Sequence, residues 1–272
     1  MNQLTMQAAA MLDELRRKTP LVHNMTNYVT VNDCANAVLA IGASPIMADD
    51  IGEAGEIASV ASALVLNIGT LNERTIASML SAGRQANASG VPIVFDPVGA
   101  GASSLRNETT EQILEQLDIA VIRGNLSEVS FCAGLSVSTK GVDVSQADMD
   151  NDAATVAAAV ARQFGCVAAI TGEVDVISDG SRTARIANGH PMLSRVTGTG
   201  CMTSALVGAW CGAAHKDFFT AAVGGVASMG IAGELAYEAA GEKGTGSFHL
   251  AIIDALSILD GKRLMERAKI NE

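Results

Sequence analysis

The sequence contains few aromatic side chains and is rich in small residues instead. Phe, Tyr and Trp make up 3% of the 272 residues, against 27 glycines, and 49% of the chain is hydrophobic. Small side chains let helices and strands approach closely, so we expect tight helix-on-sheet layers and binding sites lined by backbone. With only 17% charged residues, the composition excludes an intrinsically disordered chain.

Cysteines are scattered and odd in number, and no Cys-x-x-Cys pair occurs. The five are Cys34, Cys132, Cys166, Cys201 and Cys211. This pattern argues against a disulfide framework and a zinc site, and it fits reduced thiols. Residues 1–20 carry Asp13 and Glu14 within an apolar stretch, which predicts an amphipathic helix and not a signal peptide. We therefore expect a cytoplasmic protein.

Positive charge is also scarce. Lys and Arg number 18 against 29 Asp and Glu, which gives a net charge of −11. This balance opposes binding to nucleic acid and to anionic membranes, so any phosphate has to be captured by a few local groups. Residues 196–214 and 218–233 are uncharged, but they are rich in Gly and Ala, and we predict buried core helices there instead of membrane spans.

Short apolar runs alternate with segments of helical spacing. The predicted strands are residues 63–68, 91–95, 119–122 and 167–170. Alternation of this kind favours an α/β protein in which helices cover both faces of a parallel sheet. No long linker divides the chain, so we expect one domain over residues 1–272, helical from about residue 197 to the end.

Each predicted strand is followed by a polar, glycine-containing segment. These segments are residues 69–70, 96–101, 123–128 and 171–175. Because ligands bind beyond the carboxyl ends of strands in open parallel sheets, we expect the four segments to meet at one edge and form a site.

The glycine-rich residues 197–204 lead into an uncharged helix. Glycines permit close approach, and free N–H groups at a helix start bind anions. The segment matches neither a P-loop nor a dinucleotide fingerprint. A plain helix cap with packing glycines explains it equally well. Cys201 lies where a helix start stabilises a thiolate, and it is a candidate base, nucleophile or small core residue.

Asp96 and Glu128 follow neighbouring predicted strands. Two carboxylates in one cleft suit Mg²⁺, although a turn and a helix cap are equally ordinary roles for them. Arg123 is either a phosphate clamp or a solvated strand end. The polar residues 23–29 and the segment around Met47 would line a small-molecule pocket or form a buried turn network.

Seven segments are distinctive when taken in order: residues 20–27 (PLVHNMTN), 42–48 (GASPIMA), 96–101 (DPVGAG), 123–128 (RGNLSE), 171–173 (TGE), 196–201 (VTGTGC) and 244–248 (GTGSF). Together they resemble the hydroxyethylthiazole kinases of thiamine salvage, within the ribokinase-like group. The resemblance implies a three-layer αβα fold with a mainly parallel central sheet and without a separate lid domain. It also implies transfer of the ATP γ-phosphoryl group to the hydroxyl of 4-methyl-5-(2-hydroxyethyl)thiazole with Mg²⁺.

The resemblance also implies roles for individual residues and an assembly. ATP would be contacted by Arg123, Thr171, Asn125 and Gly200, the thiazole by Met47, Gly198 and Asn27, and Mg²⁺ by Asp96 and Glu128. Members of the family assemble as homotrimers with active sites at subunit boundaries. The segment ending at Asn27 would then serve a neighbouring subunit's pocket.

One position departs from the wider group. Most ribokinase-like kinases carry an Asp base after Gly-x-Gly, where this chain has Cys201. Our hypothesis is that its thiolate orients or deprotonates the substrate hydroxyl. Alternatives are a hydroxymethylpyrimidine-type kinase, a nucleotide-dependent repair dehydratase, and a non-catalytic sensor of thiazole or nucleotide. A Cys-nucleophile acyltransferase would need a His base, and no His flanks the strand exits. With so few aromatics, we expect aliphatic contacts to hold adenine.

Overall fold

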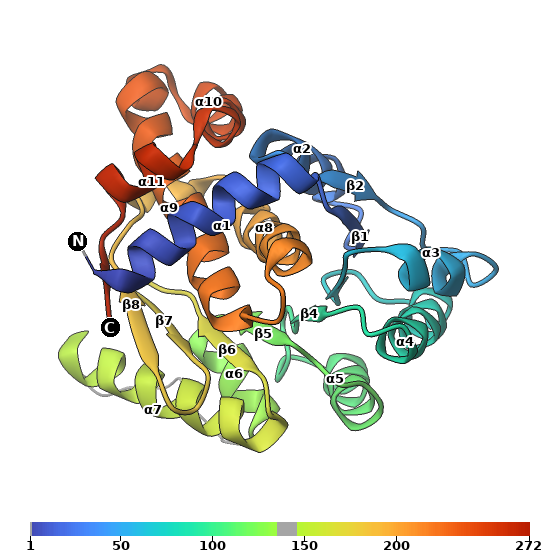
Figure 1. Ribbon diagram of the computed structural model, residues 1–272. Coiled ribbons are helices and arrows are strands. Elements are labelled where there is room, and N and C mark those ends of the chain that lie inside the picture. The colour runs from blue at the N-terminus through green and yellow to red at the C-terminus, as the bar shows by residue number, and fades with distance from the viewer. Residues whose placement is uncertain (1, 135–145) are drawn as a thin grey trace.

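The computed structural model describes residues 2–134 and 146–272, with side chains of the second part described from residue 153. Its sheet has nine strands in the order β2-β1-β3-β4-β5-β6-β7-β8-β9 (Figure 1). The strands are β1 Leu21–Met25, β2 Ser44–Ile46, β3 Ala63–Asn67, β4 Ile93–Asp96, β5 Val121–Gly124, β6 Val167–Ile170, β7 Asp175–Ser178, β8 Thr183–Ile186 and β9 Ile270–Asn271. Pairing is parallel from β2 through β6 and antiparallel from β6 to β9.

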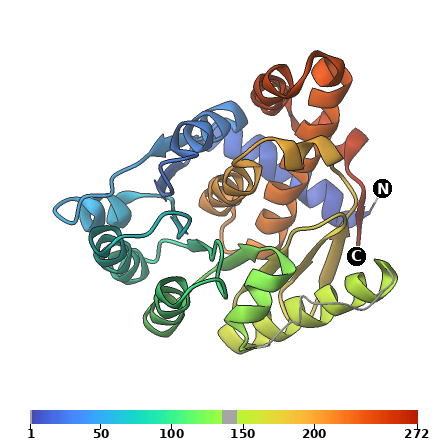
Figure 2. The ribbon, with the colours of Figure 1, turned by 180° about the vertical axis from the view of Figure 1, so that it is seen from behind.

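Helices cover both faces of this sheet (Figures 1 and 2). On one face lie α1 Gln3–Lys18, α2 Val31–Ile41, α8 Thr199–Ala213, α9 Phe218–Ala240, α10 Thr245–Ile258 and α11 Gly261–Arg267. On the other lie α3 Ala54–Val60, α4 Glu73–Ala88, α5 Ser104–Gln116, α6 Leu126–Cys132 and α7 Gln146–Phe164. The predicted three-layer αβα architecture is confirmed.

Alternation along the strands builds one hydrophobic core on each face. In β3, Val65 packs into the core beside α8, while Leu64 and Leu66 pack into the core beside α4. Successive side chains of a strand point to opposite faces, and these strands are covered on both, so their sequences read as continuous apolar runs. This is why the runs 63–68 and 167–170 identify β3 and β6.

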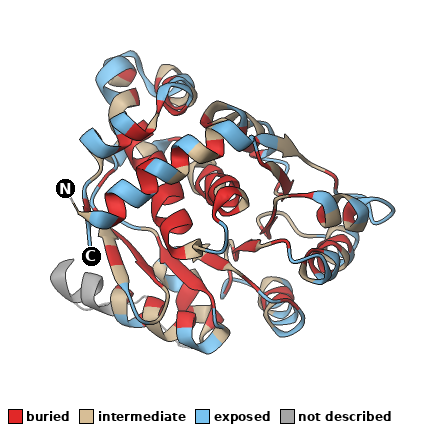
Figure 3. Cartoon of the chain, in the orientation of Figure 1, coloured by how far each residue is buried: buried red, intermediate tan, exposed pale blue. Residues whose placement is uncertain are grey.

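The uncharged segments form core helices, as predicted. Residues 218–243 are long and apolar enough to cross a membrane, but 83% of their most apolar window is buried inside the protein. Figure 3 shows α8 and α9 as predominantly buried. Glycine allows the packing: a Cβ on Gly208 would lie 2.4 Å from Val65 Cγ2, and one on Gly224 would lie 2.1 Å from a ring carbon of Trp210.

One expectation about the sheet is wrong. The chain is not helical from residue 197 to its end, because β9 pairs with β8 and aligns Ile270 with Ile186. The sheet is mainly parallel, as predicted, and β7 to β9 add an antiparallel edge. A two-residue strand has no period of its own. It forms because β8 offers unpaired backbone groups and because Asn2 donates from its side chain to the carbonyl of Ile270 at 2.9 Å.

Candidate active site

The polar strand exits meet at the carboxyl edge of the sheet, as the sequence predicts. Asp96 ends β4, Arg123 lies in β5, and Thr171 follows β6, where its N–H donates to the carbonyl of Gly124 at 2.9 Å. The start of α8 reaches the same edge and brings Gly200 and Cys201 with it. A Cβ on Gly200 would lie 3.1 Å from Arg123 Nη1. Four segments distant in sequence therefore surround one point.

Asp96 is fully buried, and its two oxygens have different surroundings. Oδ2 accepts from Asn67 Nδ2 at 2.6 Å and from Ser204 Oγ at 2.8 Å, while Arg123 Nη1 lies 3.7 Å from it. Oδ1 has no hydrogen-bond partner among the described residues. Burial raises the pKa of this carboxyl to about 6, against the opposing effect of Arg123. Asp96 is thus a firmly held carboxylate with one oxygen free for a ligand.

Positive charge is concentrated beside this carboxylate. Arg123 Nη2 donates to Thr171 Oγ1 at 2.5 Å, and the guanidinium lies against the helix start at Gly200. Its Nε is buried without a partner in the described part of the chain. A guanidinium next to the N-terminus of a 15-residue helix forms an anion site suited to phosphate. An acidic chain that binds phosphate needs a local site of this kind.

Glu128 and Asn125 form a capping box at the start of α6. Asn125 Oδ1 accepts the Glu128 N–H, and Glu128 Oε2 accepts the Asn125 N–H, each at 2.9 Å. Glu128 Oε1 also accepts from the Gly99 N–H at 2.9 Å, which ties the exit of β4 to α6. The ordinary interpretation, a helix cap, is therefore part of what these residues do. Within the described residues, no group of three or more His, Cys, Asp and Glu gathers as a metal cluster.

Cys201 is half-buried, and its sulfur faces two side-chain amides. Asn27 Nδ2 lies 3.2 Å and Asn67 Nδ2 3.4 Å from Sγ. Gly198, the N-cap of α8, has φ of 86°, and a Cβ there would lie 2.6 Å from Thr30 Cγ2. The helix start thus packs directly against the turn that carries Asn27.

Met47 lies beside β2, partly buried against the core of the α8 face. The neighbouring Ala48 is held by the buried His23, whose Nε2 lies 2.7 Å from the Ala48 carbonyl oxygen. Desolvation lowers the pKa of His23, so its ring is neutral at physiological pH. His23 of β1 therefore supports the segment around Met47 from within the same chain.

Three residues of this edge are not among the sequence-predicted site residues: Asn67, Ser204 and Arg106. Arg106 Nη1 donates to the carbonyls of Ile68, at 2.7 Å, and Val98, and Nη2 donates to that of Gly69 at 2.8 Å. It thereby joins the exits of β3 and β4. Asn67 carries a signal that sequence analysis overlooks, because it is the polar residue within the predicted strand 63–68. No feature of the sequence around Arg106 indicates that it lies at this edge.

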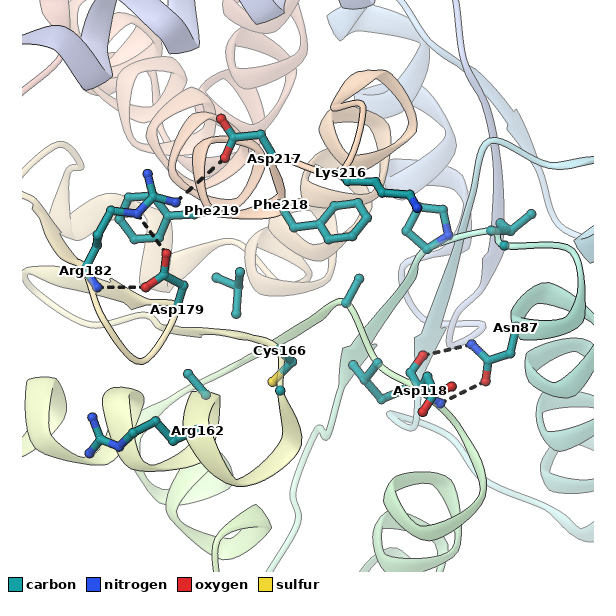
Figure 4. A pocket seen from close by; sticks show the side chains of 18 residues that line it. Asn87, Asp118, Arg162, Cys166, Asp179, Arg182, Lys216, Asp217, Phe218 and Phe219 are labelled. Carbon is teal, nitrogen blue, oxygen red and sulfur yellow. Dashed lines mark hydrogen bonds and ion pairs between the residues drawn. The ribbon is translucent and has the colours of Figure 1, made fainter.

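A separate groove of about 670 Å³ lies at the opposite edge, where β4, β5 and β6 begin (Figure 4). Three cationic and three anionic side chains line it, and among them Arg182 pairs with Asp179 at 2.8 Å and lies 4.2 Å from the ring centroid of Phe219. None of the predicted site residues lines it. The candidate active site is therefore the carboxyl edge.

Comparison with known proteins gives one consistent result. A sequence model of the Hydroxyethylthiazole kinase family matches residues 12–262. Hydroxyethylthiazole kinase of Ruminiclostridium cellulolyticum is 63% identical over all of both chains, and that of Methanocella arvoryzae is 44% identical over 96% of this chain and 97% of the other. The solved hydroxyethylthiazole kinase of Pyrococcus horikoshii OT3 superposes with a TM-score of 0.88 at 40% identity, covering 97% of this chain and 98% of that one.

A more distant likeness concerns the fold alone. The pyridoxal kinase of Staphylococcus aureus, solved in complex with AMP-PCP, superposes with a TM-score of 0.57 at 18% identity over 79% of this chain and 88% of its own.

Proposed function

The chain belongs to the hydroxyethylthiazole kinase family, and on that premise we propose that it transfers the γ-phosphoryl group of ATP to the hydroxyl of 4-methyl-5-(2-hydroxyethyl)thiazole. The product, a thiazole phosphate, serves thiamine biosynthesis. The observation that carries the proposal is the meeting of Arg123, the start of α8 and the buried Asp96 at one edge of the sheet. Phosphoryl transfer depends on positioning and on charge stabilisation, which these groups supply.

The phosphates of ATP would bind between β5, β6 and α8. Arg123 offers a planar fork of N–H donors, and Thr171 holds that fork in place at 2.5 Å. Gly200 places the backbone of the helix start close to the guanidinium, because it has no side chain that would displace that group. Asn125 begins α6 at the same edge and completes the proposed nucleotide contacts.

The residues present fit a magnesium ion. Asp96 offers the free Oδ1, a hard oxygen donor, and Mg²⁺ binds through one or two carboxylates while it keeps several waters. Both oxygens of Glu128 already accept backbone N–H groups, so we propose that Glu128 acts through a water molecule. When bound, the ion would neutralise charge on the transferred phosphoryl group.

The alcohol would bind between Met47, Gly198 and Asn27, with its hydroxyl toward Cys201. Met47 provides an adaptable apolar wall for a thiazole ring, and Asn27 lies 3.2 Å from the Cys201 sulfur. We propose that this sulfur takes the hydroxyl proton. Cys201→Ala, measured at saturating ATP and Mg²⁺, should lower kcat by about 100-fold, as expected for loss of a general base. Near-normal turnover would leave the anion site as the main source of catalysis.

We also propose a homotrimer, with each active site at a subunit boundary, in the cytoplasm. In support, Tyr28 is 80% exposed and Val29 56% exposed, directly after Asn27, which leaves apolar surface beside the site. All five cysteines are free thiols, as a reducing compartment requires. Light scattering should give three times the chain mass of 27.9 kDa. A monomer that retains full activity would refute the shared-site arrangement.

Product analysis tests the reaction itself. Purified protein, ATP and Mg²⁺ are incubated separately with the thiazole alcohol and with a hydroxymethylpyrimidine, and ADP release and product mass are followed. A phosphorylated thiazole, formed together with ADP, is expected. Phosphorylation of the pyrimidine alone would indicate the other vitamin-precursor kinase, and absence of both products would indicate a binding protein.

A further inference from the structure

Asn67 stands at the centre of the candidate active site without a role in the proposed reaction. It is the last residue of β3, 1% exposed, and its register partner on β4 is Asp96. Its side-chain amide contacts four groups: Oδ1 lies 3.0 Å from Asn27 Nδ2 and 2.9 Å from the Gly69 nitrogen, and Nδ2 lies 2.6 Å from Asp96 Oδ2 and 3.4 Å from Cys201 Sγ. Every hydrogen-bonding position of this amide is thus used.

These contacts determine which way both amides face. A backbone N–H only donates, so Asn67 has to present its oxygen to Gly69 and its nitrogen to Asp96 and Cys201. Since Asn67 Oδ1 is an acceptor, Asn27 has to present Nδ2 to it. Asn27 Oδ1 then accepts from the Thr30 hydroxyl at 3.2 Å.

The sulfur of Cys201 is consequently an acceptor on this side. It faces two N–H groups, at 3.2 and 3.4 Å, and both of them can only donate to it. Donors of this kind stabilise negative charge on sulfur. A thiolate sulfur that accepts from both amides keeps a further lone pair, which can take a proton.

We infer that Asn67 is a positioning residue, whose amide holds the Cys201 sulfur ready to receive the proton of the substrate alcohol. The inference rests on the proposed function. In the step it serves, the alcohol O–H bond breaks and the proton passes to Sγ, while the alcohol oxygen bonds to the γ-phosphorus of ATP. The bond between that phosphorus and the β,γ-bridging oxygen breaks and ADP leaves.

The same amide couples two parts of the site. Its second N–H holds Asp96 Oδ2 at 2.6 Å, and this leaves Oδ1 of that carboxylate free. Gly69 closes the arrangement, because a Cβ there would lie 2.7 Å from Asn27 Nδ2 and 2.9 Å from Asn67 Oδ1. The absence of a side chain at Gly69 therefore leaves room for both amides.

The rate at which iodoacetamide alkylates Cys201, measured against pH in the full-length protein without substrates, tests the inference. Peptide mapping separates Cys201 from the four buried cysteines, which are exposed by 7% or less: Cys34, Cys132, Cys166 and Cys211. Among the described residues, Cys34 interacts electrostatically with Cys201, and Arg123 and Asp96 lie beside its neighbours Gly200 and Asn67. Neither variant substitutes any of these three residues.

In Asn67→Ala we expect the profile to move to higher pH, so that alkylation at pH 7 is about tenfold slower while the plateau at high pH is unchanged. The kcat should fall by about tenfold, while the KM for the thiazole alcohol changes little. Asn87→Ala is the control for loss of an amide elsewhere: it removes two hydrogen bonds, to the backbone of Asp118 at the opposite edge, where Asn67→Ala removes four contacts.

Coincident alkylation profiles in Asn67→Ala and the unmodified protein would overturn the inference. Should Asn67→Ala not fold, Gly69→Ala replaces it, because it displaces both amides without removing a donor, and the same shift is expected. A displaced profile in a protein that phosphorylates no thiazole alcohol would refute the proposed function and leave the positioning role supported.

Discussion

Replacing Gly198 with alanine should damage both stability and activity, through two separable effects. Gly198 has φ of 86°, a conformation that costs an L-residue about 1–2 kcal/mol. The new Cβ would also lie 2.6 Å from Thr30 Cγ2 and 3.1 Å from Thr30 Cβ. Since carbon atoms pack at about 3.5–4.0 Å, Thr30 has to retreat by about 1 Å.

Thr30 is not free to retreat without consequence. It is 3% exposed, its carbonyl accepts from the Cys34 N–H at 2.9 Å, and its hydroxyl donates to Asn27 Oδ1 at 3.2 Å. Overpacking of a buried site costs about 1–3 kcal/mol. Together with the backbone cost, this predicts that Gly198→Ala lowers the free energy of unfolding by about 2–5 kcal/mol.

Activity should fall further than stability alone explains, because Thr30 carries Asn27 with it. A displacement of about 1 Å in a positioning residue reduces turnover by about 100-fold. We therefore expect kcat/KM for the thiazole alcohol to drop by this factor at a temperature where the variant remains folded.

The matched control is Gly90→Ala. Gly90 has φ of 71°, but nothing lies within 4 Å of its would-be Cβ, and it lines the groove at the opposite edge. It should lose only the backbone contribution, about 1–2 kcal/mol, with unchanged kinetics. Thermal unfolding and steady-state kinetics measure both variants. If Gly198→Ala matches Gly90→Ala in Tm and in kcat/KM, the reasoning from the Thr30 contact is refuted.

Three further predictions concern charge, packing and phosphate binding. The pKa of Asp96 is about 6 in the folded protein against 3.8 in the unfolded chain, so its contribution to stability is fully present below pH 4 and is lost as pH rises through 6. Asp96→Asn should therefore increase the free energy of unfolding at pH 8 by about 3 kcal/mol relative to the unmodified protein, with a higher Tm, and by less at pH 5. An equal difference at both pH values would contradict the raised pKa of Asp96. Gly224→Ala should destabilise the protein by about 2 kcal/mol in denaturant titrations, because the methyl meets the buried Trp210 ring at 2.1 Å, while Gly246→Ala, with open space around it, should be neutral or stabilising. Arg123→Lys keeps the charge but loses the planar fork, so calorimetry should show ATP binding weakened by about tenfold, and unchanged affinity would exclude a bidentate phosphate contact.

Local pattern was sufficient for much of the architecture. Strands buried on both faces read as apolar runs, and residues 63–68 and 167–170 coincide with β3 and β6 to within one residue. The segment 197–204 leads into α8, because Gly198 adopts the positive φ found directly before the first helical residue. Five strands are not among the predicted ones: β1, β2, β7, β8 and β9. The two residues of β9 carry no period and depend on β8 for their hydrogen bonds.

The candidate site residues likewise divide into those that the sequence predicts and those whose role it leaves open. Asp96, Arg123 and Thr171 follow from one topological rule, that polar residues after parallel strands meet at the carboxyl edge. Glu128 shows the limit of that rule, since both its oxygens accept backbone N–H groups, and sequence left open whether it caps a helix or faces a ligand.

By itself, the sequence determined the layers, the edge that carries the candidate site and the polar groups that meet there, because each depends on residues close together in the chain. Only the tertiary structure decided which side chains contact one another within the site. Asn67 meets Asp96 through strand register, and Asn27 meets Cys201 across 174 positions of sequence. Such contacts depend on how β1, β3 and α8 pack together, and no local period records that packing.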